Sequence, residues 1–292
     1  MKSGWYSASV AALFVACVFV LGLESSSAGE ADAPRSVEPG SVFVRMDYMH
    51  LTDSTPQEYL ELELGEWRAI QEQRIRRGVT TAWYFYEMMP GARKDGDQPY
   101  DYITVSVFPS YDNVFDEAAT EAIFDVYPGI DLQEMYARAD AARSFVRSDL
   151  FKLTRVTSPY TGSKPVSPYL VIDYFDTEGG SGGHIELETD IWAPVHEKRI
   201  RRGLLNSAAV LVWTNPDGEE ERDYDYAAIS YYDTLAQLRE PVDAELVRAA
   251  HPDKSTEDAA RVFERTDEAR ATYKSQLWRL IDKIEAVSLE DD

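Results

Sequence analysis

Residues 67–78 read WRAIQEQRIRRG, and residues 192–203 read WAPVHEKRIRRG. Seven of these twelve positions are identical at an offset of 125 residues. Further pairs keep the same order along the chain at offsets of 124 to 127 residues: Asp47 and Asp173, Tyr102 and Tyr226, Arg143 and Arg270. Ordered matches at a nearly fixed spacing indicate an internal repeat. We therefore predict a tandem duplication, in which the chain contains two copies of one structural unit.

Composition sets the boundaries of the predicted parts. The first repeat covers residues 41–157 and the second covers residues 169–292, joined by a linker at residues 158–168 that is rich in Pro, Ser and Gly. Residues 1–28 are predicted to be a secretory signal, since Lys2 precedes a 16-residue run that is apolar apart from one serine, and small residues follow at the cleavage point. The alternative is an uncleaved membrane anchor, for which this run is slightly short. Residues 29–40 are predicted to be a flexible segment.

The composition is that of a globular protein, and it excludes several classes of function. The 292 residues carry a formal net charge of −23, which disfavours binding to nucleic acid. The single cysteine, Cys17, lies within the predicted signal. The mature protein is therefore predicted to be periplasmic or secreted, to have no thiol chemistry, and to make no membrane contact after cleavage.

Each repeat has the same predicted order of elements. In the first repeat we expect strands at residues 42–49, 79–89, 102–108 and 150–156, a helix that starts at a Thr55/Pro56/Glu58 capping box and ends at Gly78, and helices that run to about residue 147. In the second repeat we expect strands at residues 169–175, 204–213, 226–232 and from 277 onward, with helices to residue 274. The order β-α-β-β-α-β is that of a ferredoxin-like unit, and the predicted class is α+β.

This pattern resembles the dimeric α/β-barrel superfamily, in which two ferredoxin-like units pack sheet to sheet. The resemblance implies an intrachain pseudo-dimeric α/β barrel, and hence a monomer with an internal pseudo-twofold axis. More narrowly, WAPVHEKRI at residues 192–200, followed by Gly203 and a Tyr-Asp-Tyr strand, looks like a group of exported bacterial proteins of unknown function. The superfamily includes cofactor-free monooxygenases, haem-degrading enzymes and ligand-binding proteins, so the resemblance selects no activity.

His196, Asp173 and Tyr226 are the candidate catalytic residues. His196 replaces Gln71 on the apolar stripe of the long helix, where it could shuttle a proton or bind haem iron, or be a buried structural histidine. Asp173 lies among apolar residues of a strand, as a general base or as the partner of an arginine or hydroxyl. Tyr226 could line a pocket or fill the core.

Six further residues are candidates for binding a ligand: Trp67, Trp192, Asp47, Tyr102, Arg77 and Arg202. The two tryptophans lie on the stripe of the long helix in each repeat, where they could also be core residues. The two arginines lie at the ends of these helices, and they either bind an anionic group or complement the helix dipole. Asp47 is expected on the same strand face as Arg45, and Tyr102 belongs to a Tyr-Asp-Tyr strand.

Two functions remain open at this point. The first is an exported binding or accessory protein for an apolar or aromatic small molecule. The alternative is a cofactor-independent or haem-linked oxidoreductase that uses one half of the barrel. No haem motif and no metal-binding motif is present in the sequence, and HEKRI lacks the second histidine of a zinc helix.

Overall fold

The computed structural model describes residues 35–37, 42–90, 100–158, 166–177, 182–214 and 223–286. The predicted signal, most of the predicted flexible segment and most of the predicted linker lie outside these residues. The chain divides into two compact units. Within the described ranges, unit 1 contains residues 42–150 and 280–286, and unit 2 contains residues 35–37 and 151–279.

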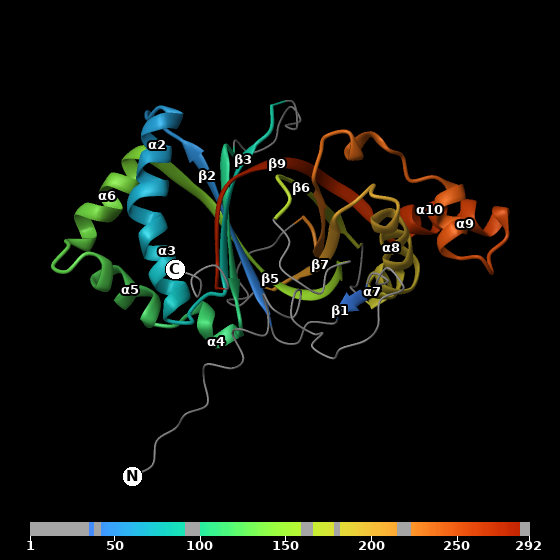
Figure 1. The fold of residues 1–292 in the computed structure, drawn as a ribbon, viewed down its shortest axis with the longest axis horizontal. Coiled ribbons are helices and arrows are strands. Elements are labelled where there is room, and N and C mark those ends of the chain that lie inside the picture. The colour runs from blue at the N-terminus through green and yellow to red at the C-terminus, as the bar shows by residue number, and fades with distance from the viewer. Residues whose placement is uncertain are drawn as a thin grey trace, which may run out of the picture. The chain divides into compact units, whose positions relative to one another are not determined.

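Unit 1 has an antiparallel sheet with helices on one side, as Figure 1 shows for α2, α3, α5 and α6 beside β2 and β3. Its strands lie in the order β5-β2-β4-β3, and the end of β9 follows β3. The elements are β2 (Phe43–Leu51), α2 (Pro56–Leu62), η1 (Glu63–Trp67), α3 (Arg68–Arg76), β3 (Ala82–Met88), β4 (Tyr102–Phe108), α4 (Tyr111–Val114), α5 (Ala118–Val126), α6 (Leu132–Ala142) and the first half of β5 (Arg143–Ser158).

Unit 2 has a similar succession of elements, with the 3-10 helix η3 where unit 1 has α4, and with the additional strand β1. Its sheet has the order β9-β6-β8-β7, followed by the second half of β5 and by β1. The elements are β6 (Tyr169–Asp176), α7 (Gly182–Glu186), η2 (Leu187–Trp192), α8 (Ala193–Arg201), β7 (Ser207–Trp213), β8 (Tyr226–Tyr232), η3 (Gln237–Arg239), α9 (Ala244–Ala250), α10 (Thr256–Ala269), β9 (Ala271–Glu285) and the short β1 (Arg35–Val37). The mixed α+β class is therefore confirmed.

The ends of the long helices follow from local sequence. Thr55 accepts a hydrogen bond from the backbone N–H of Glu58 at 3.3 Å, and the Glu58 carboxylate accepts one from the N–H of Thr55 at 2.7 Å, which confirms the predicted capping box. Gly78 and Gly203 end the helices with φ of 74° and 70°. This left-handed conformation favours glycine and explains why both repeats keep it.

Two predicted helix ends are wrong. The helices do not reach residues 147 and 274, because α6 ends at Ala142 and α10 ends at Ala269. The strands β5 and β9 start there instead, and β9 already pairs with β6 at Ala271 and Asp176. Pairing with a neighbouring strand makes these residues extended.

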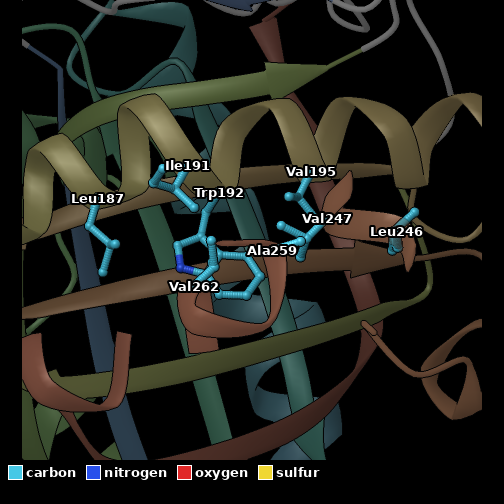
Figure 2. Packing of buried hydrophobic residues seen from close by; sticks show 8 residues of the cluster. All are labelled: Leu187, Ile191, Trp192, Val195, Leu246, Val247, Ala259 and Val262. Carbon is cyan, nitrogen blue, oxygen red and sulfur yellow. The ribbon is translucent and has the colours of Figure 1, made fainter. Parts of the chain in front are cut away.

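Trp192 is at the centre of the apolar core that joins α8 to α9 and α10 in unit 2 (Figure 2). Its indole Nε1 donates a hydrogen bond to the Thr266 hydroxyl at 3.1 Å. The residues packed with it are Leu187, Ile191, Val195, Leu246, Val247, Ala259 and Val262. Among the described residues, no helix has the length and apolar character needed to cross a membrane.

Candidate functional site

A π-helical turn sets the position of a buried glutamate in unit 2. The segment η2 continues α7 directly into α8, and its wider turn changes which side chains face the sheet. Glu188 is consequently only 2% exposed. A buried carboxylate needs partners that compensate for its lost hydration.

Arg270 and Tyr226 supply those partners. The Arg270 guanidinium donates to both the Glu188 carboxylate and the Tyr226 hydroxyl, and the Tyr226 hydroxyl donates to Glu188 Oε1 at 3.2 Å. Burial lowers the pKa of Arg270 to about 10, with nearby Asp173 opposing the shift, so the guanidinium stays charged at neutral pH. Burial also raises the pKa of Tyr226, which keeps its phenol neutral.

Asp173 completes this group, which we call the unit 2 polar cluster: Asp173, Glu188, Tyr226, Arg270 and Ser275. Asp173 lies opposite Ser275 in the pairing of β6 with β9. Burial raises the pKa of Asp173, while Ser275 and the positive charges of Arg270 and Arg199 oppose the shift. Two of the three candidate catalytic residues, Asp173 and Tyr226, are therefore next to the same guanidinium.

Two histidines lie beside the unit 2 polar cluster. His184 is 1% exposed, and its ring stacks on that of Tyr226 with centroids 4.1 Å apart. Neither of its ring nitrogens has a hydrogen-bond partner among the described residues, and burial lowers its pKa. The Nδ1 atom of His196 is likewise buried, and it has no hydrogen-bond partner in the part of the chain that the structure describes. Burial, helped by the charge of Arg199, lowers the pKa of His196 to about 3, so this imidazole is neutral at pH 7.

Unit 1 contains a corresponding group, the unit 1 polar cluster: Asp47, Tyr59, Glu63, Tyr102 and Arg143. Glu63 lies in the π-helical turn η1 and is 4% exposed. Burial raises the pKa of Glu63 to about 7, while Arg143 and the Tyr59 hydroxyl oppose the shift. Asp47 accepts a hydrogen bond from Ser148 at 2.6 Å and pairs with Arg45 at 3.3 Å.

The residues in and around the two clusters differ at two positions of the repeat. Tyr59 of unit 1 corresponds to His184 of unit 2, and Gln71 corresponds to His196. The Tyr59 ring lies 4.8 Å from that of Tyr102, as His184 lies against Tyr226. Unit 2 therefore has two imidazoles where unit 1 has a phenol and an amide.

The three residues of the repeated Tyr-Asp-Tyr sequence have three different roles. The central carboxylates are structural, because Asp101 accepts the N–H of Leu51 at 2.9 Å and Asp225 accepts the N–H of Thr177 at 2.8 Å. Only the last tyrosine of each triplet belongs to a polar cluster. The first lies near a cation: Tyr100 is 5.2 Å from the Arg147 guanidinium, and Tyr224 is 5.4 Å from the Lys274 ammonium.

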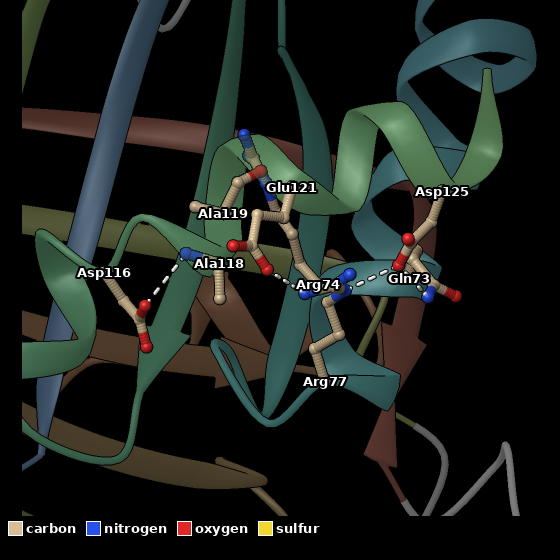
Figure 3. Close-up of polar contacts among 8 residues, drawn as sticks. All are labelled: Gln73, Arg74, Arg77, Asp116, Ala118, Ala119, Glu121 and Asp125. Carbon is tan, nitrogen blue, oxygen red and sulfur yellow. Dashed lines mark hydrogen bonds and ion pairs between the residues drawn. The ribbon is translucent and has the colours of Figure 1, made fainter. Parts of the chain in front are cut away.

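The other four predicted ligand-binding residues lie outside both polar clusters. Trp67 packs between helices of unit 1 with Ile70 and Met135, and Trp192 has the same kind of role in unit 2. Arg77 pairs with Glu121 and with Asp125, each at 2.6 Å, which raises its pKa (Figure 3). Arg202 is exposed and has no ion pair with the described part of the chain.

Sequence reasoning missed the central residues of the clusters, Glu63 and Glu188. The signal was present, because Leu62-Glu63 precedes Trp67 with the same spacing as Leu187-Glu188 precedes Trp192. A regular helix with 3.6 residues per turn would place Leu64, and not Glu63, on the buried stripe. The equivalent spacing of the two glutamates was therefore not recognised as a signal. The π-helical turn places Glu63 inside instead.

Each unit has a pocket of small-molecule size among its described residues. The Tyr102 pocket in unit 1 has a volume of about 370 Å³ and is lined by Leu51, Pro56, Glu87, Met88, Met89, Pro90, Asp101 and Tyr102. The pocket in unit 2 has a volume of about 390 Å³ and is lined mainly by η2 and α10, with the charged residues Glu186, Asp190, Arg265 and Glu268. Six of the eight residues that line the Tyr102 pocket are apolar or aromatic.

His196 lies in neither pocket. It lines a separate cavity of about 10 Å³ together with Glu188 and Arg155. An axial haem ligand must face a space that accommodates the macrocycle, so the residues around His196 do not fit haem. No group of three or more potential metal-binding side chains occurs among the residues that the structure describes.

Comparisons with known proteins give similarity at low sequence identity only. No protein-family model matches the chain, and no curated protein matches it. Similar solved structures include a haem-binding protein from Thermus thermophilus, at 11% identity and a TM-score of 0.48, covering 90% of this chain and 98% of that one. An anthrone oxidase-like protein has 13% identity and a TM-score of 0.47, covering 86% and 97% of the two chains.

A dye-decolorizing peroxidase from Bacteroides thetaiotaomicron has 11% identity and a TM-score of 0.42, covering 87% of this chain and 96% of that one. All three TM-scores are below 0.5, so these likenesses assign neither a ligand nor an activity to the chain. Its candidate sites are those that its own residues define: the two buried polar clusters, the Tyr102 pocket and the His196 cavity.

Proposed function

We propose that the chain binds a small molecule with an aromatic or apolar part in the Tyr102 pocket, as a binding or accessory protein rather than as a catalyst. The volume of the pocket supports this proposal most directly, because about 370 Å³ is within the range of roughly 300 to 1,000 Å³ found for small-molecule sites. The lining supports it too, since six of the eight side chains are apolar or aromatic.

The lining also indicates the chemistry of the ligand. Met88 and Met89 are flexible and polarizable, so they adapt to a flat apolar group. Tyr102 offers an aromatic face, and Glu87 adds a carboxylate at the same pocket. An aromatic molecule that carries a cationic or hydrogen-bond-donating group therefore suits the pocket better than an anion does.

The geometry gives less support to the alternative of an oxidoreductase. That function requires a substrate to reach His196, and a cavity of about 10 Å³ accommodates at most one water molecule. With its pKa lowered to about 3, His196 is also far from the pKa near neutrality that suits a general acid or base.

The proposal extends to the organisation of the protein. We propose that the chain is exported, on the basis of Lys2, the apolar run and the small residues near position 28. We also propose that the two copies face each other through their sheets and work as a monomer, which the repeated order of elements supports.

Three compounds with the same ring test the binding function: tryptamine, which is cationic, indole, which is neutral, and indole-3-acetate, which is anionic. Calorimetric titration of the whole chain should give affinities that fall in this order. Glu87→Gln should reduce the preference for tryptamine over indole. Met89→Glu should weaken binding of indole, because it places a charge against the apolar ring.

Glu268→Gln is the matched control, since it removes a carboxylate from the pocket of unit 2 and should leave all three affinities unchanged. The proposal is wrong if none of the three compounds binds saturably at millimolar concentration. It is also wrong if Glu87→Gln and Glu268→Gln have equal effects, because binding is then not located at the Tyr102 pocket.

A further inference from the structure

The methionines of unit 1 form two groups that differ in exposure. The chain has six methionines, and the five that the structure describes all belong to unit 1. Met46, Met49 and Met135 are buried, with exposed fractions of 0%, 2% and 0%. Met88, the last residue of β3, and Met89 after it are only partly buried. Two adjacent thioether side chains are therefore accessible to solvent, and three are not.

The three buried methionines are protected by their surroundings. Met49 Sδ accepts a hydrogen bond from the Tyr59 hydroxyl at 2.9 Å, and Met46 Sδ accepts one from the Tyr48 hydroxyl at 3.6 Å. Met135 packs between the helices of unit 1. Because susceptibility to oxidation follows exposure, an oxidant reaches these three sulfur atoms only when the fold opens locally.

The two accessible methionines line the Tyr102 pocket. At the offset of 125 residues, the corresponding residues of unit 2 are Trp213 and Thr214, and unit 2 has no methionine among its described residues. The described residues include no cysteine either. Methionine is thus the only sulfur-containing residue type in the described part of the chain, and its accessible members occur together at one pocket.

We propose that Met88 and Met89 are an oxidation site, at which a peroxide converts the two thioethers to sulfoxides and lowers the affinity of the Tyr102 pocket for its ligand. At each sulfur, a lone pair forms an S–O bond while the O–O bond of the peroxide breaks. The sulfur loses two electrons, and hydrogen peroxide is reduced to water. The effect on affinity rests on the function proposed for this pocket, whereas the position of the oxidation does not.

Oxidation changes the properties that suit Met88 and Met89 to an aromatic ligand. A thioether is apolar and polarizable and makes favourable contacts with an aromatic ring. A sulfoxide is polar, and an apolar ring cannot supply the hydrogen bonds that its oxygen loses on contact. Loss of one sulfur–aromatic contact corresponds to about 2- to 12-fold in affinity. Peroxide does not change the carboxylate of Glu87, so the preference for tryptamine over indole should remain.

Peptide mapping by mass spectrometry locates the oxidation without any ligand. After treatment of the folded chain with hydrogen peroxide, Met88 and Met89 should each gain one oxygen atom at least about tenfold faster than Met46, Met49 and Met135. In the chain unfolded in urea, all five should react at similar rates, which would show that the fold causes the difference. Similar rates of all five in the folded chain would overturn the proposal.

Calorimetric titration with indole, before and after peroxide treatment, measures the effect on binding. The affinity of the wild type should fall by about 2- to 12-fold for each sulfur–aromatic contact that is lost. The double variant Met88→Leu/Met89→Leu should have the same affinity before and after treatment, because it has no thioether at the pocket. Met135→Leu is the matched control, since it keeps both pocket methionines and should lose affinity as the wild type does.

Two results for the wild type decide the proposal even if the double variant fails to fold. An unchanged affinity for indole after complete oxidation of Met88 and Met89 would overturn it. If the untreated wild type does not bind indole, tryptamine or indole-3-acetate, the proposed function fails and the effect on affinity fails with it. The peptide map still decides in that case whether Met88 and Met89 are the site of oxidation.

Discussion

Replacing Glu63 by glutamine should remove a pH-dependent loss of stability. Burial raises the pKa of Glu63 from 4.5 to about 7. The folded state therefore holds the proton more tightly than the unfolded chain does. This contribution is fully favourable below pH 4.5 and is lost as the pH rises towards 7. A difference of about 2.5 pKa units corresponds to about 3 kcal/mol of unfolding free energy at pH 8.

Urea unfolding at pH 4.5, 6, 7 and 8 gives the unfolding free energy of the wild type and of Glu63→Gln. The difference between the two free energies at each pH measures this contribution. The difference should be small at pH 4.5, and the variant should be more stable by about 3 kcal/mol at pH 8. Other titrating groups affect both proteins alike and cancel. Parallel pH profiles would refute the reasoning, because they would mean that Arg143 keeps Glu63 ionised in the folded protein.

Glu188→Gln is the matched control in unit 2. Glu188 pairs with Arg270, so its loss leaves a buried guanidinium without its carboxylate. We expect this variant to lose about 3 to 5 kcal/mol across the same pH range, the opposite sign to Glu63→Gln at pH 8. If Glu63→Gln and Glu188→Gln change the unfolding free energy at pH 8 by the same amount, the expected difference between the two polar clusters is wrong.

Three further variants test the packing, the backbone and the surface. Leu246→Ala should lower the unfolding free energy by about 2 to 5 kcal/mol, since this side chain is 2% exposed in the core of Figure 2, and a loss below 1 kcal/mol in urea unfolding would contradict that core. Gly203→Ala should lower the unfolding free energy by about 1 to 2 kcal/mol because of its φ of 70°. An added Cβ meets nothing within 4 Å, so the backbone conformation is the only cause of this loss. An unchanged Tm would contradict this strain. Arg77→Gln should lower the Tm slightly at low salt and not at all in molar salt, because its ion pairs are exposed (Figure 3), and a salt-independent effect would exclude this account.

Much of the architecture follows from local sequence signals. The strand predicted at residues 102–108 coincides with β4, and the capping box at Thr55 and the glycine at position 78 delimit the long helical segment of unit 1 as predicted. The starts of β5 and β9 were not predictable in this way. Residues 143–148, at the start of β5, are partly or fully exposed, and pairing with neighbouring strands makes them extended.

Only some residues of the candidate sites could be predicted from the sequence. Strand alternation correctly placed Asp47 beside Arg45, at 3.3 Å. The pairing of Glu188 with Arg270 joins residues 82 positions apart, and no periodicity within one segment indicates it. A charged residue is also an improbable choice for the buried face of a helix, unless its partners are known.

The π-helical turns have a consequence for the tolerance of this fold to length changes. A π turn contains one residue more than the α-helix would need, and each residue of an α-helix turns the chain by about 100°. Deleting Gly65, whose surroundings are open, would restore regular α geometry in η1 without a clash. After the same deletion, Glu63 and Tyr59 would lie three and seven residues before Trp67, on the same face of a regular α-helix, so both would still face the sheet. The π turn thus accommodates one additional residue, and the upstream half of this helix stays in phase with its strands with or without it.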